Sequence, residues 1–398
     1  MKNTCTTLVL LLATASLFAQ WKPVPSLPGA GTDGCFAATV NGKAYVGGGV
    51  GRNTLYEYDP VSSSWTKKAN IPGPMARAWS GSFAADGKVY IIGGDSTFGG
   101  LLDDVWMFDP VSNTYSRKAD FPGGRRDGMF SWTLRVGSET RVYVGGGFDG
   151  HVILADFYEY IPSTDTWKKL PGGLPSPMLF ASTFVISNKG YVTLWEGGAF
   201  YNQLWEFDPS GNTWTEKTAC PATARGEGIG VTINGRGIAG MGQTNFEKAY
   251  TDLYSYNPST DKWTMIKDTF PAAHSAWSCA FSIGNSLYAG TGATLPDFNF
   301  SNKFYRYDMV FAGTDEPVQQ SPFIIYPNPA DDEFHIGGSI EGIQKAEVSD
   351  LQGRCLISLS QPEETVSLKE LGNGVYMVSL YTSSGVFNTK LIISRHQQ

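Results

Sequence analysis

The chain has 398 residues, enough for two or three domains, and 41% of them are hydrophobic while 17% are charged, which excludes a disordered chain and a small disulfide scaffold. Its 30 Lys and Arg against 37 Asp and Glu give a net charge of −7, so nucleic acid and anionic membrane surfaces are disfavoured as partners. Glycine, with 47 residues, and aromatic residues, at 13%, are both frequent, which favours short strands and tight turns.

The N-terminal residues 1–19 have the layout of a secretory signal peptide. A basic start at Lys2 is followed by an apolar run from Leu8 to Leu12 and by small residues up to Ala19. We expect cleavage before Gln20 and export of the mature chain; the alternative is a buried N-terminal strand. No later segment offers the 18 or more apolar residues that a transmembrane helix needs.

An aromatic phrase recurs from residue 56 to residue 263 and indicates a repeat. It reads YEYDPVSSSW, MFDPVSNTY, YEYIPSTDTW, WEFDPSGNTW and YSYNPSTDKW, and its final aromatic residues lie 50, 52, 47 and 49 positions apart. Each phrase follows a glycine-rich element, such as AYVGGG at Ala44 or VYIIGG at Val89. The residues between alternate in short β-prone runs bounded by turn residues, so each period predicts about four strands, as in a propeller blade.

This combination of double glycine, Tyr-x-Tyr-Asp and a later Trp resembles the kelch repeat. The resemblance covers residues 20–312 and implies an all-β fold, a six-bladed propeller. The sixth copy, Tyr305 to Asp308, lacks its trailing Trp, and Trp21 to Val24 supplies the missing strand, so the N-terminal strand is expected to close the ring. The fourth copy departs from the pattern, with Leu194 and Trp195 where glycines are expected, which predicts a local distortion. No Gly-His or Trp-Asp signature recurs, which argues against the WD40 repeat.

The C-terminal residues form a second predicted domain. Residues 313–322 are a polar linker, and residues 323–398 read as about seven strands of a small β-sandwich. Four elements, Tyr326 to Pro329, Asp350 to Gly353, Leu371 to Tyr376 and Lys390 to Ile393, resemble the type IX secretion sorting domain. That resemblance implies a bacterium of the Bacteroidota type, the type IX machinery as a partner, and a secreted or outer-membrane cell-surface location. The alternative is a small carbohydrate-binding sandwich.

The loops at one face of the predicted ring carry the candidate ligand-binding residues. Aligned on the second strand of each blade, Arg77 and Arg225 stand at matching positions, and Arg126 joins them after a three-residue insertion. Guanidinium, imidazole, carboxylate and indole groups near the channel mouth suit an anionic or hydroxylated ligand. The candidate ligand-binding set is Arg77, Trp79, Arg126, Arg225, Glu227, His274 and Trp277 at the rim, with Phe98 and Phe246 in the outer loops. The alternatives are an inter-blade brace for each Arg and a salt-bridge partner for Glu227.

Two classes of function remain open. We expect a non-enzymatic binding module for a glycan or protein ligand, without cofactor or metal. The alternative is a carbohydrate-active enzyme resembling the N-acetylneuraminate epimerase of this superfamily, a mutarotase for which Glu227 and Arg225 are the candidate catalytic residues. A copper oxidase of the galactose oxidase type is disfavoured because the propeller contains only His151 and His274 and no Tyr-x-His cluster.

The cysteines signal neither a zinc site nor a disulfide framework. Cys35, Cys220, Cys279 and Cys355 are widely spaced and form no CxxC pair. Cys35 and Cys279 fall on the inner strands of the first and last blades, which meet at ring closure, and whether they pair is left open.

Overall fold

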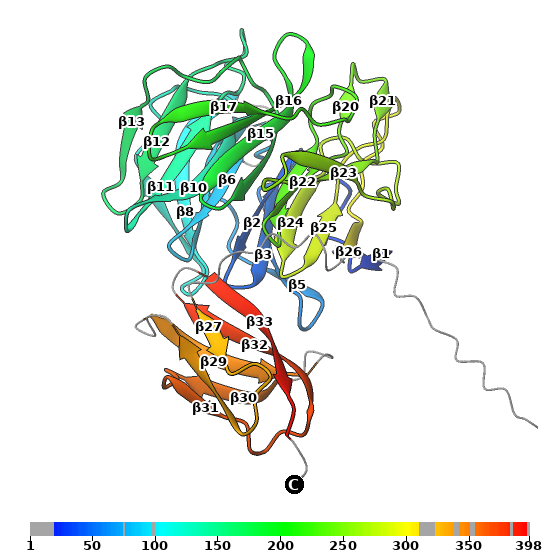
Figure 1. Cartoon of the computed structure of the whole chain (residues 1–398). Helices are drawn as coiled ribbons and strands as arrows, with labels where there is room; N and C mark the ends of the chain where they lie inside the picture. Colours follow the sequence, from blue (N-terminus) through cyan, green and yellow to red (C-terminus); the bar gives the residue numbers. More distant parts are fainter. Residues whose placement is uncertain are drawn as a thin grey trace, which may run out of the picture. The chain divides into compact units, whose positions relative to one another are not determined.

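The computed structural model describes residues 20–74, 76–96, 100–309, 323–337, 342–350, 355–382 and 385–395. The chain divides into two compact units, Met1–Pro317 and Val318–Gln398. The predicted signal peptide and the predicted linker at 313–322 lie outside the described residues. The described part is all-β, as predicted (Figure 1).

The first unit consists of six four-stranded antiparallel sheets, the blades of a propeller, each running from an inner to an outer strand. Blade 1 contains β2 (Cys35–Val40), β3 (Lys43–Gly48), β4 (Leu55–Asp59) and β5 (Ser64–Lys67). Blade 2 contains β6 (Gly81–Ala85), β7 (Lys88–Asp95), β8 (Leu101–Asp109) and β9 (Thr114–Lys118). Blade 3 contains β10 (Phe130–Val136), β11 (Glu139–Gly145), β12 (Phe157–Ile161) and β13 (Thr166–Lys169).

The second half of the propeller repeats this order. Blade 4 contains β14 (Ser182–Ile186), β15 (Lys189–Glu196), β16 (Phe200–Asp208) and β17 (Thr213–Lys217). Blade 5 contains β18 (Ile229–Ile233), β19 (Arg236–Gly240), β22 (Leu253–Asn257) and β23 (Lys262–Met265), with a small hairpin of β20 (Gln243–Thr244) and β21 (Lys248–Ala249). Blade 6 contains β24 (Cys279–Ile283), β25 (Ser286–Gly290), β26 (Phe304–Asp308) and, as its outer strand, β1 (Trp21–Val24).

The N-terminal strand closes the ring, as predicted. β1 pairs antiparallel with β26, from Trp21 opposite Tyr307 to Val24 opposite Phe304. The Trp21 indole lies 5.3 Å from the Phe270 ring and 5.2 Å from the Tyr307 ring, measured between centroids. Because one blade is built from both ends of the propeller sequence, the ring is closed, and the blade edges that remain are the short outer strands.

The six inner strands surround a central channel of about 350 Å³. Many of its lining residues are Ser or Thr, and the hydroxyls of Thr39, Ser82, Ser131, Thr133 and Thr232 donate hydrogen bonds to a neighbouring blade. Ser82 Oγ donates to the Ala37 carbonyl at 3.2 Å, Ser131 Oγ to the Ser82 carbonyl at 2.7 Å, and Thr232 Oγ1 to the Val185 carbonyl at 2.7 Å. The channel is therefore held together by side-chain hydrogen bonds between strands that share no backbone ladder.

In each repeat one residue near the end of the second strand has a left-handed backbone, at the position of the second glycine in AYVGGG. Gly48 has φ 66°, Gly93 56° and Gly146 67°, and the same position holds Leu194, Met241 and Thr291 at φ 49°, 59° and 57°. Blade 4 has a register shift between Thr193 and Trp195, but blade 2, which keeps its glycines, has the same shift between Ile92 and Gly94, so the register does not distinguish blade 4. Blade 4 therefore keeps the turn with a non-glycine residue.

The second unit is a seven-stranded β-sandwich. One sheet contains β27 (Ile324–Tyr326), β28 (Glu333–Gly337) and β31 (Thr365–Ser367); the other contains β30 (Cys355–Ser360), β29 (Ile343–Ser349), β32 (Gly374–Thr382) and β33 (Gly385–Ile393). Alternating residues of both sheets, among them Phe334, Val348 and Leu380, form one hydrophobic core.

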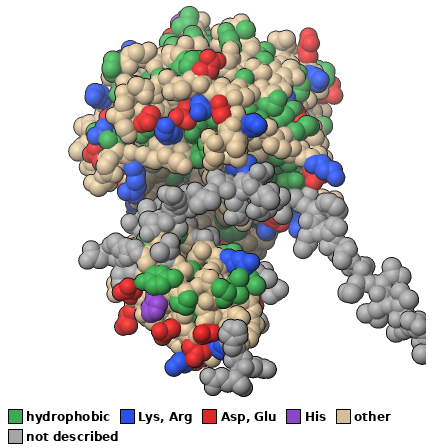
Figure 2. Space-filling model, in the orientation of Figure 1, with side chains coloured by type: hydrophobic (Ala, Val, Ile, Leu, Met, Phe, Trp, Pro, Cys, Tyr) green, Lys and Arg blue, Asp and Glu red, His purple; other side chains and the backbone are tan. Residues whose placement is uncertain are grey.

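The surface mixes acidic and basic side chains on the propeller face visible in Figure 2. Across the described residues, the structure contains no helix with the length and apolar character needed to cross a membrane. The four described cysteines carry free thiols, and Cys35 and Cys279 lie unpaired in the same core cluster.

Candidate functional site

Six equivalent residues, one at the start of each blade, form a ring around one end of the channel. They are Gly34, Trp79, Gly128, Phe180, Glu227 and Trp277, and we call them the axial ring. Backbone hydrogen bonds of 2.9 to 3.3 Å run from Trp79 N to Gly34 O, from Gly128 N to Trp79 O, from Phe180 N to Gly128 O, from Glu227 N to Phe180 O and from Gly34 N to Trp277 O. All six residues have positive φ, between 50° and 64°. Four blades accept this disfavoured backbone with a side chain present, which places those side chains at the mouth.

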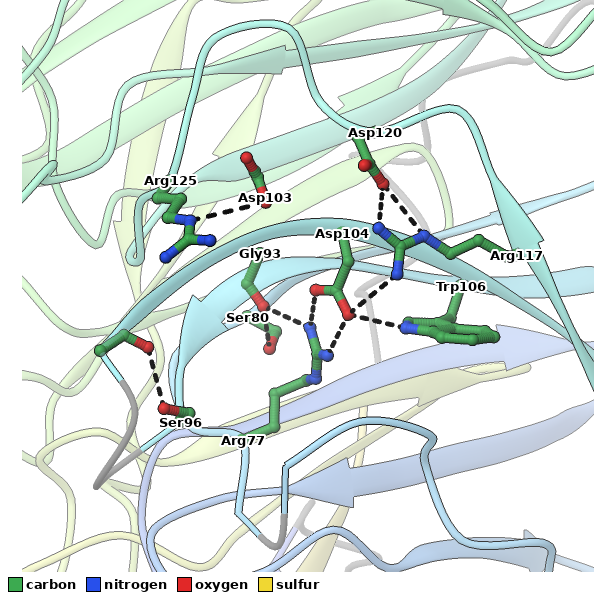
Figure 3. Close-up of polar contacts among 11 residues, drawn as sticks. Arg77, Ser80, Gly93, Ser96, Asp103, Asp104, Trp106, Arg117, Asp120 and Arg125 are labelled. Atoms are coloured by element: carbon green, nitrogen blue, oxygen red, sulfur yellow. Dashed lines mark hydrogen bonds and ion pairs between the residues drawn. The ribbon is translucent and has the colours of Figure 1, made fainter.

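Two residues before the axial ring, the arginines of blades 2, 3 and 5 are buried in ion pairs. Arg77 donates from Nη1 and Nη2 to the two carboxylate oxygens of Asp104, each at 2.6 Å, and from Nη1 to the Gly93 carbonyl at 2.9 Å (Figure 3). Its side chain has no exposed surface. Burial alone would raise the pKa of Asp104, but the Arg77 hydrogen bonds and charge lower it below its usual value.

The other two arginines repeat this geometry. Arg126 contacts Asp156 at 2.5 and 3.1 Å, and Arg225 contacts Asp252 at 2.6 and 2.9 Å. Both side chains are at most 2% exposed. Arg77, Arg126 and Arg225, which were predicted to contact a ligand, are thus each paired with an internal carboxylate and almost fully buried.

These pairs brace neighbouring blades, the alternative reading of the sequence. The backbone of Arg77 bonds to blade 1, with its N–H donating to the Arg52 carbonyl and its carbonyl accepting from Gly49, whereas its side chain holds blade 2. A buried bidentate pair fixes this geometry because both partners lose stabilisation together if either one moves.

Glu227 is the acidic residue of the axial ring. Glu227 is 5% exposed, and its Oε2 has no hydrogen-bond partner among the described residues. Burial raises the pKa of Glu227 to about 8; the Gln243 amide and the Trp277 indole partly oppose the rise, and the charges of Glu196 and Asp33 add to it. At neutral pH this carboxyl is protonated and can donate a proton.

Two further carboxyls stand close to Glu227. A Cβ on Gly226 would lie 3.3 Å from the Glu196 backbone nitrogen, so Glu196 packs directly beside the residue that precedes Glu227. Asp33, which precedes the ring residue Gly34, is 4% exposed, and burial raises its pKa to about 6. We call Asp33, Glu196, Glu227, Gln243 and Trp277 the mouth site.

Aromatic side chains cover the rest of the ring. A Cβ on Gly34 would lie 2.7 Å from the Trp79 indole nitrogen, and one on Gly128 would lie 3.0 Å from the Phe180 ring. Trp79 and Phe180 meet edge to face, with centroids 6.4 Å apart. The Trp79 indole nitrogen is buried without a hydrogen-bond partner in the described chain, which leaves a donor for a bound hydroxyl or water.

The remaining predicted site residues are distributed as follows. His274 packs between the Phe270 and Tyr305 rings, and its Nδ1 lies 3.0 Å from the Thr291 carbonyl, which accepts the Nδ1 proton. Burial lowers the pKa of His274, so its ring is neutral at pH 7. Phe246 stacks on Trp277 and is 53% exposed. Phe98 lies outside the described residues.

Comparison with known proteins bears on this architecture. Residues 3–198 and 122–292 match the family described as the KLHDC2/KLHL20/DRC7 Kelch-repeats domain. The chain belongs to the kelch-repeat family. Residues 324–394 match the secretion system C-terminal sorting domain. This kelch propeller is thus secreted through the type IX system to the cell surface or the extracellular space.

Similar curated proteins are N-acetylneuraminate epimerases. The kelch chain is 38% identical to that of Pasteurella multocida (strain Pm70) over 98 residues, which are 22% of this chain and 26% of the relative. It is 30% identical to that of Shigella sonnei (strain Ss046) over 105 residues, 24% of this chain and 28% of the relative. The match therefore spans about a quarter of these relatives' length.

A similar solved structure is titled "Structure of YjhT". It superposes with a TM-score of 0.59 at 18% identity and covers 71% of this chain and 96% of that chain. This likeness concerns the kelch fold.

Several residues of the mouth were not singled out from the sequence. Phe180 stands two residues beyond Met178, as Trp79 stands two beyond Arg77, so the same alignment extended to blade 4 would have found it. Asp33, Glu196 and Gln243 carry no motif, because what distinguishes them is burial beside Glu227. Within the described residues, no group of three His, Cys, Asp or Glu side chains is arranged to hold a metal ion.

Proposed function

We propose that this secreted kelch propeller is a carbohydrate-binding protein whose ligand occupies the mouth site. One observation carries the proposal: the buried Glu227 carboxyl, with an unpartnered oxygen, stands beside the Trp277 indole at the end of the channel. A pyranose ring offers apolar C–H faces and hydroxyl edges, and the site offers an aromatic face with polar groups at its border. Leaving such polar atoms buried and unpaired is costly, and a bound hydroxyl would satisfy them.

The charge of the mouth favours a hydroxylated ligand over one bound through an arginine clamp. The three arginines once expected to read a carboxylate are paired with Asp104, Asp156 and Asp252. The groups that remain near the ring are carboxyls, an amide and indoles, which exchange hydrogen bonds with hydroxyls. A protein, the other predicted class of ligand, would bind to the same surface.

A second candidate function is sugar mutarotation, which the similarity to N-acetylneuraminate epimerases supports. The specific observation in its favour is that the pKa values differ, about 8 for Glu227 and about 6 for Asp33. At pH 7 the first carboxyl is an acid and the second a base, and opening a hemiacetal ring requires a proton given to the ring oxygen and one removed from the anomeric hydroxyl.

The test is binding of the full chain to a glycan array. The array carries mono- to hexasaccharides of the chitin, cellulose, xylan, mannan and galactan series, together with sialylated glycans. Each hit is measured by calorimetry and by thermal shift, where a sugar at 100 times its Kd adds about 2.7 kcal/mol. We expect Trp277→Ala and Glu227→Gln to lose binding. Tyr326→Ala, which also removes an aromatic side chain but lies in the sorting domain, is expected to keep it.

Two outcomes decide between the functions. A chain that binds no glycan at all overturns the proposal. Acceleration of anomer exchange of a bound reducing sugar, followed by NMR and lost in Glu227→Gln, establishes the enzyme; binding without any acceleration establishes the binding module.

A further inference from the structure

Three aromatic rings from blades 5 and 6 are stacked beside the mouth. Phe246 is at the tip of the β20–β21 hairpin, Phe298 is in the loop after β25, and Trp277 is the axial-ring residue of blade 6. The ring centroids lie 5.7 Å apart for Phe246 and Trp277, 6.1 Å for Trp277 and Phe298, and 6.5 Å for Phe246 and Phe298. The interplanar angles are 26° to 34°, so the three rings contact one another with moderately tilted planes; we call this cluster the aromatic platform.

The platform is exposed although its rings are apolar. Phe246 is 53% exposed and Phe298 45% exposed, while Trp277 between them is 8% exposed. All three residues have positive φ, 58°, 51° and 52°, a backbone conformation that bulky side chains rarely adopt. A cluster that the backbone holds open in this way is a built surface, and exposed apolar surfaces of this kind mark contact sites.

Hydrogen bonds hold both loops in place. The Phe246 N–H donates to Gln243 Oε1 at 2.7 Å, and the Phe298 N–H donates to the Thr294 carbonyl at 3.0 Å. Gln243 is fully buried, and its amide lies near enough to Glu227 to influence that carboxyl. One side chain thus connects the platform with the mouth site, and Trp277 belongs to both.

We propose that the aromatic platform is a second sugar subsite and that the ligand is a glycan of at least two linked residues. The terminal residue occupies the mouth site, and the next residue lies with its apolar face on Phe246 and Phe298. This inference rests on the proposed function, because it extends the same binding site outward.

Size and shape favour a sugar over a protein on this surface. Stable protein interfaces bury roughly 800 Å² on each partner and involve about 20 residues a side, whereas the platform consists of three rings. Exposed aromatic rings that contact Trp277 of the mouth site match the apolar face of a second pyranose of the same chain. The proposal predicts that affinity grows with chain length.

The experiment compares chain lengths within the chitin, cellulose, xylan, mannan and galactan series, from monosaccharide to tetrasaccharide, on the full chain by calorimetry. We expect the disaccharide or trisaccharide of the recognised series to bind about tenfold more tightly than its monosaccharide, since one good aromatic contact is worth up to about a factor of ten. The variant with Phe246→Ala and Phe298→Ala is expected to lose this gain and to keep the monosaccharide affinity. Phe246→Tyr with Phe298→Tyr is expected to keep the gain.

Phe300→Ala is the matched control. Phe300 is the same residue type in the same loop and is 46% exposed, against 45% for Phe298, yet no ring contact joins it to the platform in the described chain. We expect Phe300→Ala to bind every oligosaccharide as the native chain does.

The outcomes separate the two proposals. Equal affinity for mono- and oligosaccharides, or a double-alanine variant that retains the length dependence, overturns the platform and leaves the mouth site standing. A double-alanine variant that binds all glycans normally but loses self-association or a protein ligand also overturns the sugar subsite. Failure to bind any glycan overturns the mouth site and the platform together.

Discussion

Replacing Glu227 by Gln tests whether the mouth holds a neutral buried carboxyl. The amide has nearly the same shape and stays uncharged at every pH. Burial raises the pKa of Glu227 from 4.5 to about 8 in the fold. The native chain therefore has its full stability from this group below pH 4.5 and loses stability as the pH rises toward 8, because the unfolded chain releases a proton that the folded chain retains.

The magnitude follows from the size of the pKa shift. Each pKa unit corresponds to about 1.4 kcal/mol, so the complete loss between pH 4.5 and pH 8 is about 5 kcal/mol and the loss already present at pH 7 is about 3 kcal/mol. Glu227→Gln has no such penalty. We expect the variant and the native chain to be equally stable near pH 4.5 and the variant to be more stable by about 3 kcal/mol at pH 7.

The assay is denaturant unfolding of the full chain at pH 4.5, 6, 7.5 and 9, followed by tryptophan fluorescence. All 11 tryptophans lie between Trp21 and Trp277, so the signal reports on the propeller and not on the sorting domain. Subtracting the two profiles cancels the contributions of groups that are not coupled to Glu227, such as Asp127 and His274. Identical profiles, or a variant that is less stable at pH 9, would refute the assignment of Glu227 as a buried neutral acid.

Two further predictions concern the scaffold. Arg77→Ala leaves the nearly buried Asp104 carboxylate without its cation and is expected to lower the free energy of unfolding by about 3–5 kcal/mol. Lys22→Ala breaks the exposed 3.4 Å pair with Asp308 and is expected to lower it by less than about 1 kcal/mol. Equal losses in denaturant unfolding would contradict the role of Arg77 as a brace. Gly34→Ala forces a Cβ against the Trp79 indole at φ 62°, whereas the Cβ of Gly42→Ala, at φ 75°, meets open space. We expect the first change to lower the free energy of unfolding by about 1–3 kcal/mol more than the second. Similar losses would argue against the packing of Trp79 on Gly34.

The blades and their closure could be predicted from the sequence because each repeat folds from its own local pattern. Alternating apolar residues fix the strands, turn residues fix their ends, and the phrase missing from blade 6 is present at Trp21. The fate of the arginines depends on contacts 27 or 30 residues away, between Arg77 and Asp104, Arg126 and Asp156, and Arg225 and Asp252. The local pattern of residues within one strand or turn does not predict contacts over that sequence separation.

The sequence nevertheless contains a signal for these pairs. The third strand of each blade contains an aromatic-x-aromatic triplet, such as Tyr158 to Tyr160, and one residue stands two positions before the start of that triplet. It is Asp104, Asp156 or Asp252 in the three blades that carry the arginine, and Thr54, Gln203 or Lys303 in the three that do not. Arginine and aspartate thus occur together or not at all among the six copies, which is what a bidentate pair requires.

The mouth site could be predicted only in part, because its chemistry comes from burial. Glu227 and Trp277 were found through their register two residues beyond the arginine position. The perturbed acid depends on Glu196 and Gln243 closing around it, and each of these ends a second strand or begins a hairpin with no motif of its own. Desolvation by neighbours from three blades leaves no trace in a local pattern.

Departures from the repeat locate the site within a scaffold of six similar blades. The axial-ring backbone is the same in all blades, with positive φ throughout, so its symmetry alone favours no direction. The side chains break that symmetry: glycine occupies the ring in blades 1 and 3, Glu227 occupies it in blade 5, and the exposed rings of Phe246 and Phe298 come from blades 5 and 6. Residues that give up the glycine favoured by this backbone, or that expose an apolar ring, lower stability and persist where function needs them. Trp79 and Phe180 also replace glycine in the ring, but the buried acid Glu227 and both exposed rings lie around Trp277. We therefore expect the ligand at that sector of the rim and not at the braces of blades 2 and 3.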